Sequence, residues 1–240
     1  MVGKGTFYGV GVGPGDPQLL TLKAADVIAS VGVISFIANE RHESLARRIA
    51  LPAISKKVAG SFTEITIVMP MSNDRSEANR NYDRAALTIR DELLGGKDVA
   101  FLCEGDPFFF GSFAYLYDRL HDNFEIEVVP GITSIHASAA QCGVPLGLQE
   151  ENIVVLSGRH SDETVLDALK RFDNLVIMKA GSRRAAIIEL IKNAGRIGDA
   201  RYVEYVTQAE QKIVKNILEL GLEAGPYFSL FLINCARNYR

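Results

Sequence analysis

Short apolar segments alternate with amphipathic segments along the chain. Between the apolar runs, polar and apolar positions recur with helical spacing near 17–29, 43–50, 73–94, 108–121 and 132–141. The apolar runs have the length and composition of buried strands, and they lie at 6–12, 31–37, 64–70, 98–103 and 125–130. Strands that alternate with helices in this way predict βαβ units and a mostly parallel sheet.

A turn-rich stretch, GVPLGLQEEN at 143–152, interrupts this pattern. Strand-like runs resume afterwards at 152–157, 174–180 and 200–206. Two last runs, 211–220 and 227–236, are separated only by GLEAGP, which is too short for a parallel crossover, so we expect them to be antiparallel. The sequence therefore predicts two α/β domains, 1–144 and 145–240, the second with a mixed sheet.

Gly-Asp-Pro closes an apolar run twice, at residues 15–17 and 105–107. At each turn the aspartate, Asp16 or Asp106, is well placed as a helix N-cap and the following proline as the first helical residue. Both turns are expected where a parallel strand ends, which is the sheet edge at which open α/β folds bind ligands. A helix-capping role alone explains either turn equally well.

The glycines around the first turn do not have the spacing of a nucleotide-binding loop. Gly9, Gly11, Gly13 and Gly15 do not satisfy G-x-G-x-x-G, and no Gly-Lys-Ser/Thr follows. An aspartate at a helix N-terminus would also repel a pyrophosphate there. These turns suit a ligand with positive charge and no phosphate, such as S-adenosylmethionine.

Composition narrows the remaining possibilities. A net charge of −3 and a pI near 5.9 argue against a nucleic-acid partner. The three cysteines are odd in number and lie in apolar sequence, which is typical of reduced thiols in the cytoplasm. The four histidines lack ligand spacing, so no metal is expected, and no stretch is long enough to span a membrane.

Four segments together resemble the tetrapyrrole (precorrin and uroporphyrinogen) methyltransferases over essentially the whole chain. They are GVGVGPGDPQLLTLKAADVI at 9–28, LCEGDPFFFGSF at 102–113, VVPGITSIHASAA at 128–140 and LVIMKAG at 175–181. FFFGSFAYLYDRL and PYFSLFL look most like the branch that methylates C20 of precorrin-2. The resemblance implies a homodimer of two-domain subunits, with S-adenosylmethionine in the cleft between the domains and S-adenosylhomocysteine as product.

The resemblance also assigns candidate residues. Tyr205 and Val206 fall where the family often has a small residue or glycine, and residues 35–37 lack an aspartate that some relatives carry. The loop around the first turn is expected beside the substrate through Gly13, Gly15 and Asp16. The residues expected to contact the cofactor are Pro14, Glu104, Gly105, Asp106, Phe109, Thr133, Ser134, Met178, Tyr205 and Val206.

Methyl transfer from a sulfonium to an electron-rich carbon needs no protein nucleophile, so positioning is the expected contribution of the chain. The base that removes the C20 proton is unknown; Glu104 and Glu204 are candidates by position, with a capping or solvated carboxylate as the favoured role. Because the acceptor carries many carboxylates, Arg159, His160 and Arg183 are expected to bind it, or else to be ordinary surface charges.

Several alternatives stay open. The acceptor is either metal-free precorrin-2 or its cobalt-bearing counterpart, or another position of a tetrapyrrole is methylated. A methyltransferase of the same fold acting on RNA or protein is a further possibility. A non-catalytic nucleotide-binding module is the alternative from a different class.

Overall fold

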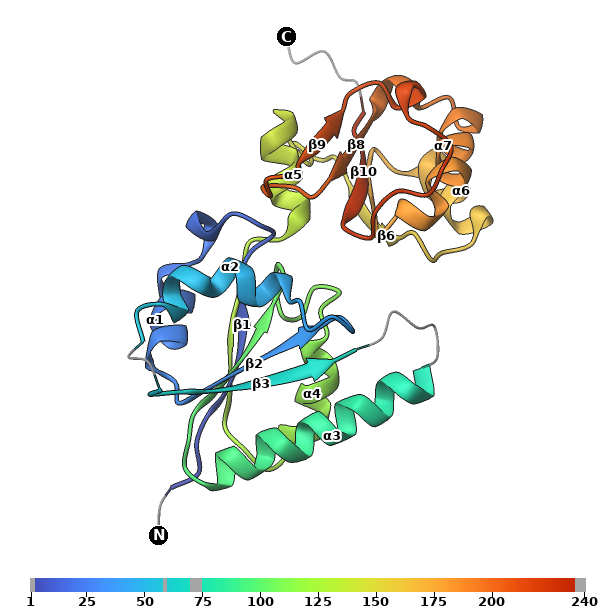
Figure 1. Cartoon of the computed structure of the whole chain (residues 1–240). Helices are drawn as coiled ribbons and strands as arrows, with labels where there is room; N and C mark the ends of the chain where they lie inside the picture. The colour runs from blue at the N-terminus through green and yellow to red at the C-terminus, as the bar shows by residue number, and fades with distance from the viewer. Residues whose placement is uncertain (1–2, 58–59, 70–74, 236–240) are drawn as a thin grey trace. The chain divides into compact units, whose positions relative to one another are not determined.

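The computed structural model describes residues 3–57, 60–69 and 75–235. The chain divides into two compact units between Thr133 and Ser134, and each is built on its own sheet (Figure 1). Helix α5 (Ser134–Cys142) therefore belongs to the second unit. The domain boundary predicted from the sequence lies after residue 144, which is past the end of α5.

The first unit contains a five-stranded sheet with the order β3-β2-β4-β1-β5. All of its strand pairs are parallel, as the sequence predicts. The strands are β1 (Phe7–Gly11), β2 (Val33–Ala38), β3 (Thr63–Val68), β4 (Val99–Cys103) and β5 (Ile126–Val129).

Helices cover both faces of this sheet, and central strand β4 shows how. Its odd-numbered side chains, such as Phe101, pack with α3 and α4, whereas Ala100 and Leu102 pack with α1 and α2. Burial on both faces explains the continuous apolar runs. The helices are α1 (Leu22–Ser30), α2 (Leu45–Ile54), α3 (Arg75–Leu94) and α4 (Phe113–Leu120).

Two of the expected helices become α-helical several residues later than the pattern indicates. The segment near 17–29 is split into a 3₁₀ helix, Pro17–Leu19, and α1, whose N-cap Thr21 accepts a hydrogen bond from the Ala24 N–H at 3.1 Å. The segment 108–121 becomes helical only at Phe113. Residues 73–74 of the helix expected at 73–94 lie outside the described residues, and α3 occupies the rest.

The second unit has a mixed sheet with the order β6-β7-β10-β8-β9, in which only β6 and β7 are parallel neighbours. This confirms the predicted fold class. The strands are β6 (Ile153–Ser157), β7 (Asn174–Met178), β8 (Ala200–Glu204), β9 (Lys212–Val214) and β10 (Ser229–Ile233).

The last two strands are not antiparallel to each other, so that expectation is wrong. Both run antiparallel to β8 and lie on opposite sides of it. Strand β9 ends at Val214, which leaves residues 215–228 as a connection long enough for a crossover. All of β10 is buried, which suits a central strand, whereas β9 is partly exposed and forms the edge.

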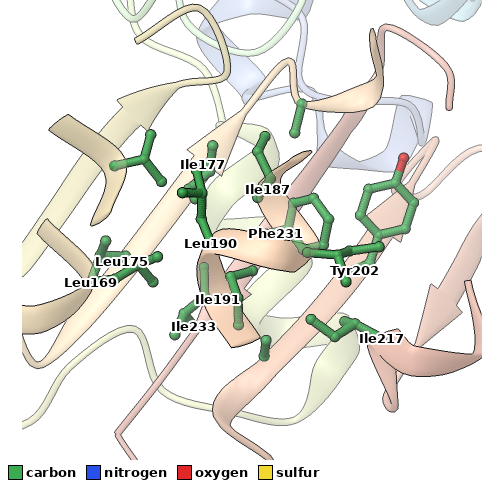
Figure 2. Packing of buried hydrophobic residues seen from close by; sticks show 14 of the residues in the cluster. Leu169, Leu175, Ile177, Ile187, Leu190, Ile191, Tyr202, Ile217, Phe231 and Ile233 are labelled. Atoms are coloured by element: carbon green, nitrogen blue, oxygen red, sulfur yellow. The ribbon is translucent and has the colours of Figure 1, made fainter. Parts of the chain in front are cut away.

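Helices α6 (Asp162–Arg171) and α7 (Arg184–Asn193) pack against this sheet. Alternate residues of the central strands, such as Ile177 and Phe231, meet Ile187 and Ile191 of α7 in one apolar core (Figure 2). Successive residues of a strand face opposite sides, so every second position of β7 and β10 is committed to these helices.

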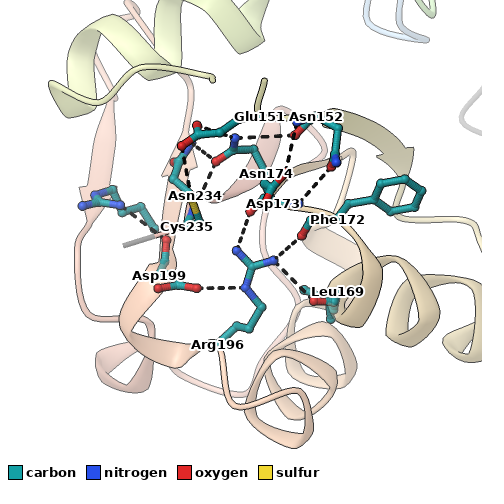
Figure 3. Close-up of polar contacts among 11 residues, drawn as sticks. Glu151, Asn152, Leu169, Phe172, Asp173, Asn174, Arg196, Asp199, Asn234 and Cys235 are labelled. Atoms are coloured by element: carbon teal, nitrogen blue, oxygen red, sulfur yellow. Dashed lines mark hydrogen bonds and ion pairs between the residues drawn. The ribbon is translucent and has the colours of Figure 1, made fainter. Parts of the chain in front are cut away.

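The amino edge of the second sheet is held by a polar network (Figure 3). Arg196 donates to the carbonyl oxygens of Phe172 at 2.8 Å and Asp173 at 2.7 Å, just after α6. Asn174 Oδ1 accepts the backbone N–H of Cys235 at 3.1 Å, which fixes the end of β10. No candidate site residue belongs to this network; the candidates from Arg159 to Val206 lie at the opposite edge, where β6, β7 and β8 end.

Candidate functional site

The two Gly-Asp-Pro turns lie side by side at the carboxyl edge of the first sheet. Strands β1 and β4 are parallel neighbours, with Gly11 opposite Cys103. Just beyond them the Gly105 N–H donates to the Gly13 oxygen at 2.9 Å, and the Gly13 N–H donates to the Gly105 oxygen at 3.3 Å. Both glycines have left-handed φ angles, +82° at Gly13 and +70° at Gly105, where a side chain would be strained. The prediction that both turns follow parallel strands is confirmed.

The loop after β5 closes against the same two turns. A Cβ atom on Gly131 would overlap the carbonyl oxygen of Gly105, and one on Gly11 would lie 2.6 Å from the Gly131 nitrogen. Backbone meets backbone here, so neither position has room for a side chain. We call residues 12–16, 104–111 and 130–133 together the triple-loop edge.

Asp106 joins the second turn to the third loop. Its Oδ1 accepts the Phe108 N–H at 3.0 Å, and its Oδ2 accepts the Gly131 N–H at 3.1 Å. The expectation that Asp106 and Pro107 begin the following helix is wrong, because α4 begins at Phe113 after N-cap Ser112. The carboxylate is used to hold two loops together.

Asp16 has the capping role that the sequence predicts. Its carboxylate accepts the Gln18 N–H at 2.8 Å at the start of the 3₁₀ helix, with Pro17 in the first position. A negative charge thus already occupies this N-terminus. Pro14 is buried and Gly15 is half-buried in the same loop.

The remaining first-unit candidates lie near these loops. Phe109 is half-buried and meets the Phe110 ring edge-on at 5.1 Å. It precedes α4 and is therefore not part of that helix's core stripe, contrary to the helical spacing. Thr133 ends the third loop beside Gly105. A Cβ atom added to Gly105 would lie 3.7 Å from the Thr133 Cα. Ser134 is the first residue of α5.

Glu104 extends away from the turns toward helix α2. Its Oε1 accepts the backbone N–H of Ala46 at 3.2 Å, in the first turn of that helix. A carboxylate is favoured at a helix N-terminus because the free N–H groups there carry partial positive charge. This is the capping role that the sequence argument favoured for Glu104.

The neighbouring thiol of Cys103 is fully buried at the end of β4. Burial raises its pKa well above the usual value, and the charges of Glu104 and Asp106 raise it further. The thiol therefore stays protonated at neutral pH and is unsuited to act as a nucleophile.

The carboxyl edge of the second sheet carries other candidates. Met178 is buried at the end of β7, and Val206 is buried just after β8. Tyr205 has a left-handed φ of +48°, and its N–H donates to the Phe228 oxygen at 2.9 Å. This bend ends β8 at Glu204, short of the strand predicted to reach residue 206.

Of the three basic candidates, Arg159 and His160 lie in the loop after β6, and Arg183 contacts this loop. Arg183 donates to the Gly158 oxygen at 2.9 Å, and it also contacts the His160 oxygen and the Asp162 carboxylate. Its guanidinium is therefore used to fasten this loop. The ring Nδ1 of His160 lies 3.0 Å from the Ser157 oxygen, whereas Arg159 is exposed.

Glu204 is buried in an ion pair rather than solvated or capping a helix. Its Oε1 accepts from Arg184 at 3.3 Å, and Arg184 is only 4% exposed. Arg184 also pairs with exposed Glu223 at 2.6 Å and faces the Tyr202 ring at 5.8 Å. Burial raises the Tyr202 pKa, and the Glu204 charge adds to this.

The described ranges hold neither a metal-binding group of side chains nor a helix that could cross a membrane. Residues 3–57, 60–69 and 75–235 contain no group of three or more His, Cys, Asp or Glu side chains placed to hold a metal ion. None of the described helices has the length and apolar character needed to cross a membrane.

The sequence matches the family "Tetrapyrrole (Corrin/Porphyrin) Methylases" over residues 6–220, which is most of the chain. The chain belongs to this family. The resemblance seen in the four sequence segments is therefore confirmed for the tetrapyrrole methylases as a whole.

Three relatives match nearly the whole length of this tetrapyrrole methylase. Cobalamin biosynthesis protein CobIJ of Mycobacterium bovis is 33% identical over 241 residues, with 97% of this chain matched to 46% of that protein, so the chain spans about half its length. A precorrin-2 C(20)-methyltransferase from Sinorhizobium sp is 30% identical, covering 97% of this chain and 96% of the relative. A cobalt-precorrin-2 C(20)-methyltransferase from Salmonella typhimurium is 30% identical, covering 96% and 97%.

Solved structures of tetrapyrrole methylases share the fold. The cobalt precorrin-4 methyltransferase CbiF aligns with a TM-score of 0.71 at 22% identity, over 95% of this chain and 94% of that chain. A uroporphyrin-III C-methyl transferase from Thermus thermophilus, complexed with S-adenosyl homocysteine, aligns with a TM-score of 0.65 at 24% identity, over 96% and 97%.

Two basic residues of this tetrapyrrole methylase were missed by the sequence argument. Lys179 lies directly after β7, and Arg184 begins α7. A lysine immediately after the apolar run 175–178 was a usable signal, because that position is at the carboxyl edge. Nothing in the local sequence distinguishes Arg184 from an ordinary exposed helix residue.

Proposed function

We propose that this protein transfers a methyl group from S-adenosylmethionine to C20 of precorrin-2. The observation that carries the proposal is the triple-loop edge, where three loops are locked together by backbone contacts. Relatives named for C20 methylation match nearly all of the chain, and one of them supports the cobalt-bearing acceptor as the alternative. The triple-loop edge by itself does not indicate which acceptor is methylated.

The residues of the triple-loop edge fit a cationic methyl donor better than a phosphate. Its three segments contain Asp16, Glu104 and Asp106 and no lysine or arginine. Asp16 already holds an N–H at the 3₁₀ helix start, where a phosphate would otherwise bind. When bound, S-adenosylmethionine supplies an electrophilic methyl group on a positively charged sulfur.

The chain contributes by positioning. We propose that Pro14, Gly105, Asp106 and Phe109 hold the donor and that Gly13 and Gly15 lie beside the acceptor. Alignment of this kind supplies about 7–11 kcal/mol in favourable cases. The Cys103 thiol, kept protonated by burial, takes no part.

Further contacts rest on the family resemblance. We propose that Thr133 and Ser134 hydrogen-bond the methionine portion of the donor and that Met178, Tyr205 and Val206 contact it from the second sheet. A homodimer is proposed on the same ground, and a cytoplasmic location because the three cysteines are typical of reduced thiols. Light scattering coupled to size exclusion tests the oligomeric state.

Calorimetry and product analysis test the function. The protein is titrated with S-adenosylmethionine, S-adenosylhomocysteine and NAD, and is then incubated with methyl-labelled donor and precorrin-2, with and without cobalt. Binding of the first two ligands and label at C20 are expected. NAD binding without response to the other two would favour a nucleotide-binding module, and label at another carbon would reject the C20 assignment alone.

Substitution of Glu104 separates a base from a capping carboxylate. Because the Gln amide oxygen still accepts the Ala46 N–H, Glu104→Gln is expected to keep turnover within about twofold, whereas Glu104→Ala loses one hydrogen bond to a charged group and is expected to lower the free energy of unfolding by about 1.5–3 kcal/mol. Stopped-assay kcat, calorimetric Kd for the donor and urea unfolding are measured on both variants. If Glu104→Gln loses turnover while its donor affinity is unchanged, Glu104 is the base after all.

A further inference from the structure

Lys179 is held in an unusual backbone conformation at the carboxyl edge of the second sheet. Its φ is +55°, in the left-handed region that a lysine rarely adopts. Hydrogen bonds clamp the residues on both sides: the Met178 oxygen accepts the Gly158 N–H at 2.6 Å, and the Ala180 N–H donates to the Ser229 oxygen at 3.4 Å. Strained residues persist where their surroundings fix them, and such places are often functional.

The Lys179 side chain lies beside exposed aromatic rings. Its ammonium is 5.4 Å from the centre of the Tyr227 ring. Tyr227 and Phe228 are each 40% exposed, and their rings meet edge-on with centroids 5.2 Å apart. An aromatic pair beside a cation offers a ligand both an apolar surface and a positive charge.

A second cation lies on the adjoining loop. Exposed Arg159 follows Gly158, and a Cβ on Gly158 would be 2.7 Å from the Lys179 carbonyl oxygen, so the two loops pack backbone to backbone. Arg183 fastens the loop of Arg159 by a hydrogen bond to the Gly158 oxygen at 2.9 Å. Lys179 and Arg159 therefore lie at this edge on loops whose backbones are fixed by hydrogen bonds and close packing.

We infer that Lys179, with Arg159 and the ring of Tyr227, binds a carboxylate-bearing edge of the tetrapyrrole acceptor. The inference rests on the proposed function, because precorrin-2 is a macrocycle with many acidic side chains. Lysine and arginine bind carboxylates by charge-assisted hydrogen bonds, and an aromatic ring contacts the apolar surface of the macrocycle. Arg183, which donates to the Gly158 oxygen, acts as a positioning residue for this edge.

Three variants of Lys179 test the inference. Lys179→Gln removes the charge, Lys179→Arg keeps it, and Lys179→Gly removes it while fitting the left-handed backbone. The KM for precorrin-2 is expected to rise about tenfold in the Gln and Gly variants, as for loss of one charge-assisted bond, and by less than about threefold with Arg. Donor affinity and kcat should change little, and the KM effect should shrink as salt is added.

Lys170→Gln is the matched control, because it removes the same charge from the exposed end of α6 in the same unit. Unchanged KM in both Lys179→Gln and Lys179→Gly overturns the inference, as does an equal loss of donor affinity. If the wild-type protein does not methylate precorrin-2, the proposed function fails on its own. Fluorescence titration of the same variants with uroporphyrin III, a polycarboxylate tetrapyrrole, then decides the inference: equal affinity for all of them overturns it.

Discussion

Gly131→Ala is expected to weaken S-adenosylmethionine binding and to lower turnover by about a hundredfold or more, the rate cost that a 1 Å misplacement at a reacting site can carry. The new methyl group would overlap the Gly105 carbonyl oxygen and lie 2.8 Å from the Gly11 Cα. Both neighbours are backbone atoms on other loops, so no side chain can rotate away to relieve the overlap. The third loop must move, and the Gly131 N–H then loses the Asp106 carboxylate, now at 3.1 Å.

The measurements are calorimetric titration with the donor and a turnover assay, together with circular dichroism to verify that the variant is folded. Gly32→Ala is the matched control, because the added Cβ would meet only the flexible Lys97 side chain at 3.8 Å in the same unit. Its affinity should equal that of the wild type. Wild-type affinity in Gly131→Ala would mean that the interlock of the three loops does not govern donor binding.

The first unit could largely be predicted from sequence because its signals are local. Each apolar run is a strand, the inner strands β1, β2 and β4 are largely buried on both faces, and the two Gly-Asp-Pro turns follow β1 and β4. The pairing of the two turns through Gly13 and Gly105 was not predictable from either turn alone. It depends on β1 and β4 being neighbours, which is a property of the whole sheet.

The errors in the first unit have the same origin. The local sequence around Asp106 is typical of a helix N-cap. One of its carboxylate oxygens instead accepts a hydrogen bond from the Gly131 N–H, which is 25 residues away in sequence. Phe110 adopts a left-handed φ of +54° between this turn and α4, which delays the helix to Phe113. Tertiary contacts thus override a local capping signal whose contribution is only about 1 kcal/mol.

In the second unit, strand existence was predicted better than strand order. The run that becomes β10 is buried at every position, and its four apolar residues after Ser229 favour a place between β7 and β8 over pairing with the nearest strand in sequence. Charged residues were harder still. Arg183 and Arg184 are adjacent, yet one fastens a loop and the other is buried in an ion pair.

Glu204→Ala is expected to lower the free energy of unfolding by about 3–5 kcal/mol, the usual effect of removing one partner from a buried ion pair. Arg184 would keep only exposed Glu223, and its guanidinium would remain buried at 4% exposure. Urea unfolding followed by circular dichroism measures the change. Glu210→Ala, at an exposed position in the same unit, should change stability by less than about 0.5 kcal/mol.

The same substitution decides whether Glu204 is a catalytic base. As a structural ion-pair partner, its removal lowers stability but leaves kcat per folded molecule near the wild-type value at a temperature where the variant is folded. Glu204→Gln should lose less stability than the Ala variant, since its amide oxygen still accepts from Arg184, now 3.3 Å from the carboxylate. A stable variant with little turnover would assign proton removal to Glu204, and the Arg184 pair would then serve to hold that base in place.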